Sequence, residues 1–272
     1  MADSGKRKMR EGPSNHSNKK RKGAGKWHKT QVQTPRSNIE TGDWGVFVTC
    51  EMGRESKCAA EVVDFLTQNV ENAGNAADDA ASNSDEDDIE AQIQKEINGL
   101  NPSTKKSSLF QTFKFDLPCL SFVRFDKTIN PEKLVHQICL EAHANPDKKR
   151  SRYIQRLTPT RSIRKTLSVD LEEFAREVLK PHFHSGGPPR KYAIRPSVRG
   201  NKKFNRDIII KTVADVVGPE HPVDLKNYDL VILVDVVQNV VGMSVAGSDY
   251  DKLKRYNLAE LYNPDSKKAP ES

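Results

Sequence analysis

A basic stretch with strand-forming residues inside it constrains this chain more than any other feature. Residues 148–166 read KKRSRYIQRLTPTRSIRKT and hold eight Lys or Arg and no acid. Tyr153, Ile154 and Leu157 are spaced through it, so it contains a strand whose charges must stay on a folded surface. Eight like charges repel one another, which favours a polyanionic partner. The alternative is a solvated basic loop beside an ordinary strand.

A second basic segment, residues 190–211, has the same character. It holds eight Lys or Arg and a single acid, and includes a strand predicted at residues 191–198. We expect the two segments to form one RNA-binding surface, with the basic residues on phosphates and aromatic residues on bases or in the core; Tyr192 is expected in the core. The predicted RNA-binding residues are Lys148, Lys149, Arg150, Arg152, Arg156, Arg161, Arg164, Lys165, Arg195, Arg199, Lys202, Lys203 and Arg206.

Polar segments surround and interrupt the folded part. Residues 1–41 are polar, with basic runs at 6–10 and 19–22 that are typical of nuclear import or RNA contact, or that serve only solubility. Residues 71–108 include an acidic insertion, which could recruit a basic partner but is more simply a solvated loop. The net charge of +7 for 272 residues supports an anionic partner.

Hydrophobic spacing predicts alternating strands and helices between these segments. Asn130, Ser168 and Asn205 are predicted to cap helices, and Pro181 to end the second of them. A mixed order of this kind indicates an α+β architecture of two consecutive modules. Strands are predicted at 46–50, 110–115, 120–125, 152–157, 191–198, 230–237 and 240–245, and helices at 55–70, from 131, from 169, from 206 and after 249.

Signatures of catalysis and of bound groups are missing from the sequence. The four cysteines have no ligand spacing, and neither GxGxxG nor GxxxxGK[ST] occurs. His182 and His184 could form half of a metal site, but no acidic or cysteine residue has suitable spacing. No apolar run approaches the length of a membrane span. We therefore predict no catalytic residue, metal, cofactor or membrane segment, and an intracellular protein.

Several motifs together resemble one family. The chain is similar to THUMP-domain proteins, and most similar to the stand-alone group that acts as an adaptor in eukaryotic tRNA acetylation. The resemblance covers residues 45–262 and is carried by Gly45–Cys50, Pro131–Val135, Arg152–Pro159, Pro181–His184, Val223–Asp229 and Arg255–Leu258. One departure is Pro196, which interrupts a strand, so that the end of this strand should bend or lie at a sheet edge.

The resemblance implies a fold and a domain order. The expected fold is α+β, with an N-terminal ferredoxin-like module followed by a THUMP module, a disordered basic tail and an acidic insertion. The expected divisions are 1–41 (tail), 42–146 (first module, with the insertion at 71–108), 147–248 (THUMP domain) and 249–272 (C-terminal helix and polar tail).

The resemblance also implies a function. It is that of a non-catalytic adaptor without cofactor, which presents serine and leucine tRNAs to a separate ATP-dependent RNA cytidine acetyltransferase. The product is N4-acetylcytidine in the D-arm, and THUMP modules typically meet the acceptor end of the tRNA. The expected location is the nucleus and nucleolus, with some protein in the cytoplasm. Two alternatives remain: a small RNA-modifying enzyme with an unrecognised site, and an RNA-binding scaffold of ribosome assembly.

Overall fold

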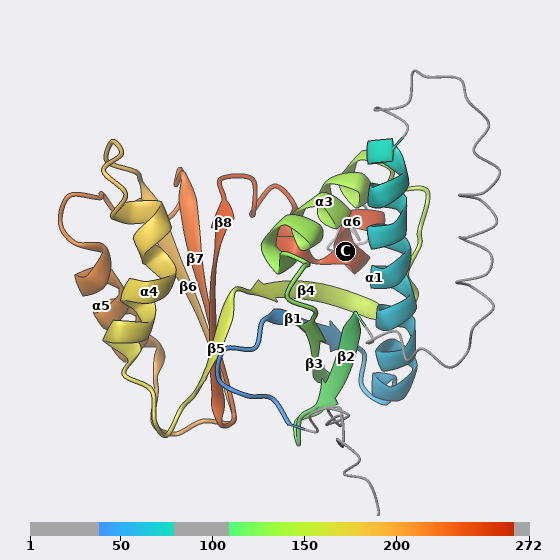
Figure 1. Ribbon diagram of the computed structural model, residues 1–272, viewed down its shortest axis with the longest axis horizontal. Coiled ribbons are helices and arrows are strands. Elements are labelled where there is room, and N and C mark those ends of the chain that lie inside the picture. Colours follow the sequence, from blue (N-terminus) through green and yellow to red (C-terminus); the bar gives the residue numbers. More distant parts are fainter. Residues whose placement is uncertain (1–37, 79–108, 264–272) are drawn as a thin grey trace, which may run out of the picture. The chain divides into compact units, whose positions relative to one another are not determined.

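The computed structural model describes residues 38–78 and 109–263 (Figure 1). These residues form two four-stranded sheets, called here sheet A and sheet B, each with helices packed on one face. The mixed α+β class predicted from the sequence is confirmed. No helix in these two ranges combines the length and apolar character that a membrane crossing requires.

Sheet A has the ferredoxin-like order of strands and helices. Every adjacent pair is antiparallel, and the spatial order is β2-β3-β1-β4. Helices α1 and α3 cover one face, where Val62, Leu66 and Val135 are buried against Val46 and Val123 of the sheet. The elements are β1 (Gly45–Cys50), α1 (Glu55–Asp78), β2 (Phe110–Lys114), β3 (Leu120–Phe125), α3 (Pro131–Ala144) and β4 (Ile154–Thr160).

Three boundaries in this part differ from the sequence prediction. Helix α1 continues to Asp78, eight residues beyond its predicted end at 70, so the predicted insertion begins inside a helix; residues 79–108 lie outside the described part. Strand β4 pairs with β1 in sheet A, although its residues were expected in the second module. Ile39, expected in the tail, is buried in one cluster with Phe47 and Ile163.

Sheet B follows directly and has the order β5-β8-β7-β6. Its strands are β5 (Ser162–Lys165), β6 (Tyr192–Arg199), β7 (Leu230–Val237) and β8 (Val240–Gly247). Only β6 and β7 run parallel, and α4 (Leu171–Phe183) and α5 (Arg206–Val217) cover one face. Pro196 lies on β6, which is an edge strand, as predicted: an edge strand can lack an N–H donor on its open side.

The helix ends of the two modules test the predicted caps. Asn130 and Asn205 accept hydrogen bonds from Lys133 N (3.0 Å) and Ile208 N (2.8 Å), which confirms both caps. The predicted cap at Ser168 is wrong. Asp170 caps α4 instead, and its carboxylate accepts hydrogen bonds from the backbone amides of the first turn. An ionised carboxylate is favoured over a hydroxyl at the positive end of a helix.

Pro181 does not end α4. The helix runs on to Phe183, since the His184 amide still bonds Lys180 O at 3.1 Å and the Phe183 ring is buried. Because Pro181 has no N–H group, the helix loses one backbone hydrogen bond in its last turn and no more.

The two sheets meet through β8. Ser244 Oγ donates to Pro159 O at 2.6 Å, and Arg161 N donates to Met243 O at 2.9 Å. At Gly242 the contact is so close that an added Cβ would lie 2.7 Å from Cγ2 of Thr160 and 3.0 Å from Cε2 of Phe47. A glycine is therefore required where β8 crosses the end of β4.

The C-terminal segment packs beside α3 and β4. A short 3-10 turn, η1 (Lys254–Tyr256), leads into α6 (Leu258–Tyr262). Leu253, Leu258 and Leu261 are buried in the same core as α1 and α3, and the helix predicted after residue 249 begins only at Leu258.

Candidate nucleic-acid interface

The two faces of sheet B differ in chemistry. Ile194 of β6, Val234 of β7 and Met243 of β8 are buried under α4 and α5. Successive side chains of a strand point to opposite faces, so Arg195 and Arg199 of β6 lie on the other face. The strand thus separates an apolar face that holds the helices from a face that carries basic residues.

Asp235 joins the two predicted basic segments on this second face. It is paired in register with Ser197, and burial raises the pKa of its carboxyl to about 6. The charge of Arg199, a hydrogen bond from Ser197 and the charge of Arg156 oppose that rise in pKa. Arg156 comes from β4 and Arg199 from β6, so one arginine from each basic segment acts electrostatically on this carboxylate.

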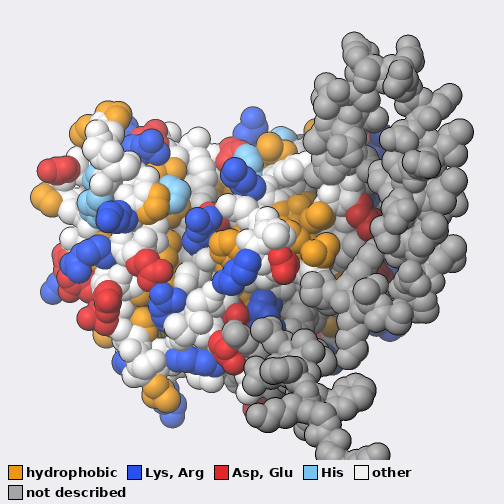
Figure 2. All heavy atoms as spheres, viewed as in Figure 1, with side chains coloured by type: hydrophobic (Ala, Val, Ile, Leu, Met, Phe, Trp, Pro, Cys, Tyr) orange, Lys and Arg blue, Asp and Glu red, His pale blue; other side chains and the backbone are white. Residues whose placement is uncertain are grey.

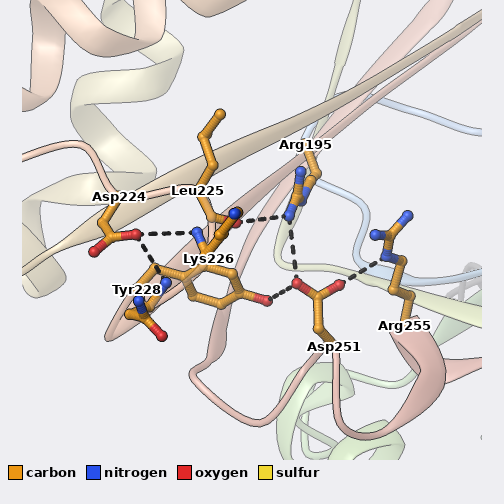
Figure 3. Close-up of polar contacts among 8 residues, drawn as sticks. Arg195, Asp224, Leu225, Lys226, Tyr228, Asp251 and Arg255 are labelled. Carbon is orange, nitrogen blue, oxygen red and sulfur yellow. Dashed lines mark hydrogen bonds and ion pairs between the residues drawn. The ribbon is translucent and has the colours of Figure 1, made fainter.

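A second acid, Asp251, gathers three more side chains (Figure 3). Its Oδ2 accepts from the Tyr228 hydroxyl at 2.8 Å and from Arg195 Nη2 at 3.3 Å, and its Oδ1 accepts from Arg255 Nε at 2.7 Å. Burial works against ionisation of Asp251, but hydrogen bonds from Arg255 and Tyr228 outweigh it and lower the pKa. Arg195 Nη2 also donates to Leu225 O at 3.2 Å. We call Arg156, Arg195, Arg199 and Arg255 the arginine cluster.

Arg255 is held by an unusual backbone turn. Lys254, Arg255 and Tyr256 have φ values of 53°, 55° and 57°, a left-handed run that costs non-glycine residues roughly 1–2 kcal/mol each. The Tyr256 ring is buried and meets the Tyr250 ring edge-on at 4.8 Å, and Arg255 N donates to Tyr250 O at 2.8 Å. Burial of Tyr256 thus holds the turn while Arg255 stays exposed on the surface.

Another basic group forms at one end of sheet B. Strands β5 and β6 lie at opposite edges, but the loop after β6 crosses beneath the β7–β8 turn, where Asn201 Nδ2 donates to Gln238 O at 2.6 Å. Lys203 Nζ then reaches Thr166 O at 2.6 Å. The end group consists of Lys165, Lys202, Lys203 and Arg206, of which Lys202, Lys203 and Arg206 are exposed.

Two of the predicted residues instead serve internal contacts. Arg164 pairs with Glu177 at 2.5 Å and lies over the Phe174 ring, which joins β5 to α4. Arg161 lies 3.8 Å from Glu132 and over the Trp44 ring, near the junction of the two sheets.

The residues before β4 form a separate group. Lys148, Lys149, Arg150 and Arg152 lie near the end of β4 that pairs with Cys50, whereas Arg161 follows the end that pairs with Gly45. Arg150 is 3.6 Å from Glu141 and borders a hollow of about 240 Å³ between α1 and α3. The predicted residues therefore do not build one surface. They divide among the arginine cluster, the sheet-end group, the group before β4 and two internal pairs.

The helix-covered side of sheet B does not present a continuous basic patch. Figure 2 shows Lys and Arg side chains there mixed with Asp and Glu over α4 and α5. Arg176 and Glu172 of α4 are such a pair, 2.6 Å apart and each more than half exposed. This side is that of an ordinary solvated helix surface.

The histidines have structural explanations. Burial, with help from Arg161 and Arg190, lowers the pKa of His182. His221 accepts from Arg190 N at 3.0 Å and contacts Phe183 O at 3.1 Å, so it fastens the end of α4. Among residues 38–78 and 109–263, no three metal-ligand side chains lie close enough to hold an ion.

The predicted RNA-binding residues did not include Asp235, Asp251, Tyr228 or Arg255. The spacing of Asp251 and Arg255 by four residues is a visible signal of a possible pair, but the left-handed turn that aims Arg255 has no glycine to mark it. Asp224 closes a turn, in which its Oδ1 accepts from the amides of Lys226 and Asn227.

Comparison with known proteins gives the family. The family model of the THUMP domain matches residues 168–246. An uncharacterized protein of Schizosaccharomyces pombe is 35% identical over 233 residues, covering 84% of this chain and 78% of that protein. THUMP domain-containing protein 1 of Bos taurus is 31% identical over 236 residues, covering 82% of this chain and 64% of the bovine protein.

A third relative bears the name of an activity. The Saccharomyces cerevisiae protein named tRNA acetyltransferase TAN1 is 28% identical over 271 residues, covering 90% of this chain and 93% of that protein. The matched residues 168–246 include β6, β7 and all but the last residue of β8, and therefore three strands of sheet B. On these grounds the chain belongs to the family of THUMP-domain proteins.

Proposed function

We propose that this protein is a tRNA-binding adaptor for tRNA acetylation. The observation that carries the proposal is that Arg156 and Arg199, from separate basic segments, both act electrostatically on the Asp235 carboxylate in a face of the THUMP sheet. Arginines fixed on a folded surface suit phosphate contacts, since their planar guanidinium matches phosphate geometry. A relative named for tRNA acetylation supports tRNA as the ligand.

The finer part of the proposal concerns the reaction. The chain presents serine and leucine tRNAs to a separate RNA cytidine acetyltransferase, which forms N4-acetylcytidine. The basic runs at residues 6–10 and 19–22 support a nuclear and nucleolar location. Holding tRNA and enzyme on one protein raises the effective concentration of substrate, to an order of millimolar for short links, without any change in the chemical step.

The main alternative is catalysis by this chain itself, which the name of the yeast relative makes concrete. A hollow of about 240 Å³ between α1 and α3 and one of about 310 Å³ beside the segment that joins β2 to β3 are not lined by any member of the arginine cluster. A substrate base held at the cluster would therefore not enter either hollow. This separation favours the adaptor.

Reconstitution distinguishes the two functions. Purified protein is incubated with unmodified serine tRNA, acetyl-CoA and ATP, with and without the acetyltransferase, and the nucleosides are analysed by mass spectrometry. We expect no acetylcytidine from the chain alone, and more from the pair than from the acetyltransferase alone. Product from the chain alone would establish the enzyme instead, and an equal yield with and without the chain would refute the adaptor. A tRNA of another amino acid is the specificity control.

A further inference from the structure

The Asp251 carboxylate holds two arginines, and only one of them, Arg195, lies within the residues that match the THUMP domain. Asp251 and Arg255 both follow residue 246, where the match ends, whereas Arg195 lies within it. We propose that Arg195 and Arg255 form a clamp for a phosphodiester of the RNA backbone, and that Asp251 is the positioning residue that holds both guanidiniums. The inference rests on the proposed function, because it takes tRNA as the ligand.

The clamp has donors to spare. A guanidinium carries five N–H groups, and Arg255 uses only its Nε on Asp251. Its Nη1 and Nη2 have no hydrogen-bond partner among the described residues, and Figure 3 shows them directed away from Asp251. The side chain of Arg255 is 56% exposed and that of Arg195 30% exposed, so solvent reaches both. Two arginines on one carboxylate leave a net positive charge for an anion.

The clamp is also preorganised. Arg195 is fixed by Leu225 O as well as by Asp251, and the Tyr228 hydroxyl holds the same carboxylate oxygen. Burial and the neighbouring Asp251 raise the pKa of Tyr228 to about 12, so the hydroxyl keeps the proton that it donates. Groups that are already ordered lose less conformational entropy when a ligand binds.

The clamp adjoins the rest of the arginine cluster. Arg156 forms an isolated bridge with Asn257, two residues beyond Arg255. Burial raises the pKa of Tyr250, and the charges of Arg156 and Arg255 both act to lower it. A backbone that contacts Arg255 can therefore continue toward Arg156.

A matched pair exists on the opposite side of the sheet. Arg176 and Glu172 have the same four-residue separation as Arg255 and Asp251 and a similar distance, 2.6 Å against 2.7 Å. That pair lies on α4, and Glu172 holds one arginine rather than two. Substitutions in this pair therefore change the charge in the same way as those in the clamp, but outside the proposed site, and serve as controls.

The test measures dissociation constants of the full chain for an unmodified serine tRNA transcript at several salt concentrations. Loss of one phosphate contact weakens binding about five- to eightfold at about 0.1 M salt and lowers the salt slope by about one. We expect this for Arg255→Gln, and about twofold or less for Arg176→Gln. Circular dichroism melting verifies that each variant is folded.

The decisive variant is Asp251→Asn, because the two explanations predict opposite signs. Removal of a negative charge beside an RNA site strengthens binding if charge alone matters, whereas loss of positioning weakens it. We expect Asp251→Asn to weaken binding several-fold and Glu172→Gln to leave it within about twofold. Tighter binding by Asp251→Asn, or an Arg255→Gln variant that binds like Arg176→Gln, would overturn the clamp. A wild-type chain that does not bind tRNA would overturn the proposed function itself, and the clamp with it.

Discussion

Gly242 provides a direct test of how the two sheets pack. A Cβ at this position would lie 2.7 Å from Thr160 Cγ2 and 3.0 Å from both Thr160 Oγ1 and Phe47 Cε2, and both neighbours are almost fully buried. Inserting a methyl group into a packed site costs about 1–3 kcal/mol, and replacing a glycine returns about 0.4–1 kcal/mol through the unfolded chain. Gly242→Ala should therefore destabilise the protein on balance.

The assay is thermal unfolding followed by circular dichroism or calorimetry. The net cost is at most about 2.6 kcal/mol, and a domain of this size loses about 2–4 °C of Tm per kcal/mol, so we expect Gly242→Ala to melt up to about 10 °C below the wild type. Gly187→Ala is the matched control, since its Cβ would meet nothing within 4 Å, and it should melt at or slightly above the wild type.

A second substitution identifies the atom responsible. Thr160→Ser removes Cγ2, the nearest atom to the added methyl, so the destabilisation by Gly242→Ala should be smaller in that background by about 1 kcal/mol. If Gly242→Ala melts like Gly187→Ala, the close packing of β8 on β4 is not as described here.

Three further predictions concern charge. The double reversal Lys202→Glu with Arg206→Glu should weaken tRNA binding at least about tenfold with little change in Tm, because both side chains are exposed at the sheet end; unchanged affinity in a filter-binding assay would exclude this group. Burial raises the pKa of Asp235 from 3.8 to about 6, so the folded state holds a proton there that the unfolded state releases, and stability falls as pH rises through this range. Asp235→Asn should make the difference in unfolding free energy between pH 4 and pH 7 smaller by roughly 2 kcal/mol; an unaltered difference would contradict the pKa. Removal of residues 1–41 should reduce tRNA affinity less than the double reversal does, and abolished binding would assign the contact to the tail.

The sequence predicted elements whose local signals agree with their packing. Strands β7 and β8 have near-continuous apolar residues, and the caps Asn130 and Asn205 precede good helical spacing. Strand β5 was missed because it has four residues and only Ile163 is buried. In a strand this short, pairing with β8 rather than alternation decides the structure.

The candidate site was predictable only in part. Basic composition identified Arg156, Arg195 and Arg199, because charge is visible in sequence. Arg164 was also predicted to bind RNA because of its charge. Composition does not reveal that Glu177 is 2.5 Å away and pairs with it. Arg255 belongs to a motif of the resemblance, but its part in the site was not predicted, because its placement depends on a left-handed turn stabilised by tertiary burial of Tyr256.

The function that we propose is support of the acetylation of serine and leucine tRNAs by a separate enzyme. Its most direct test is mass spectrometry of nucleosides from purified serine and leucine tRNAs of cells that lack the protein. The adaptor account predicts that N4-acetylcytidine disappears from both tRNAs and returns when the wild-type chain is supplied. N4-acetylcytidine at wild-type levels in those tRNAs without the protein would contradict the account.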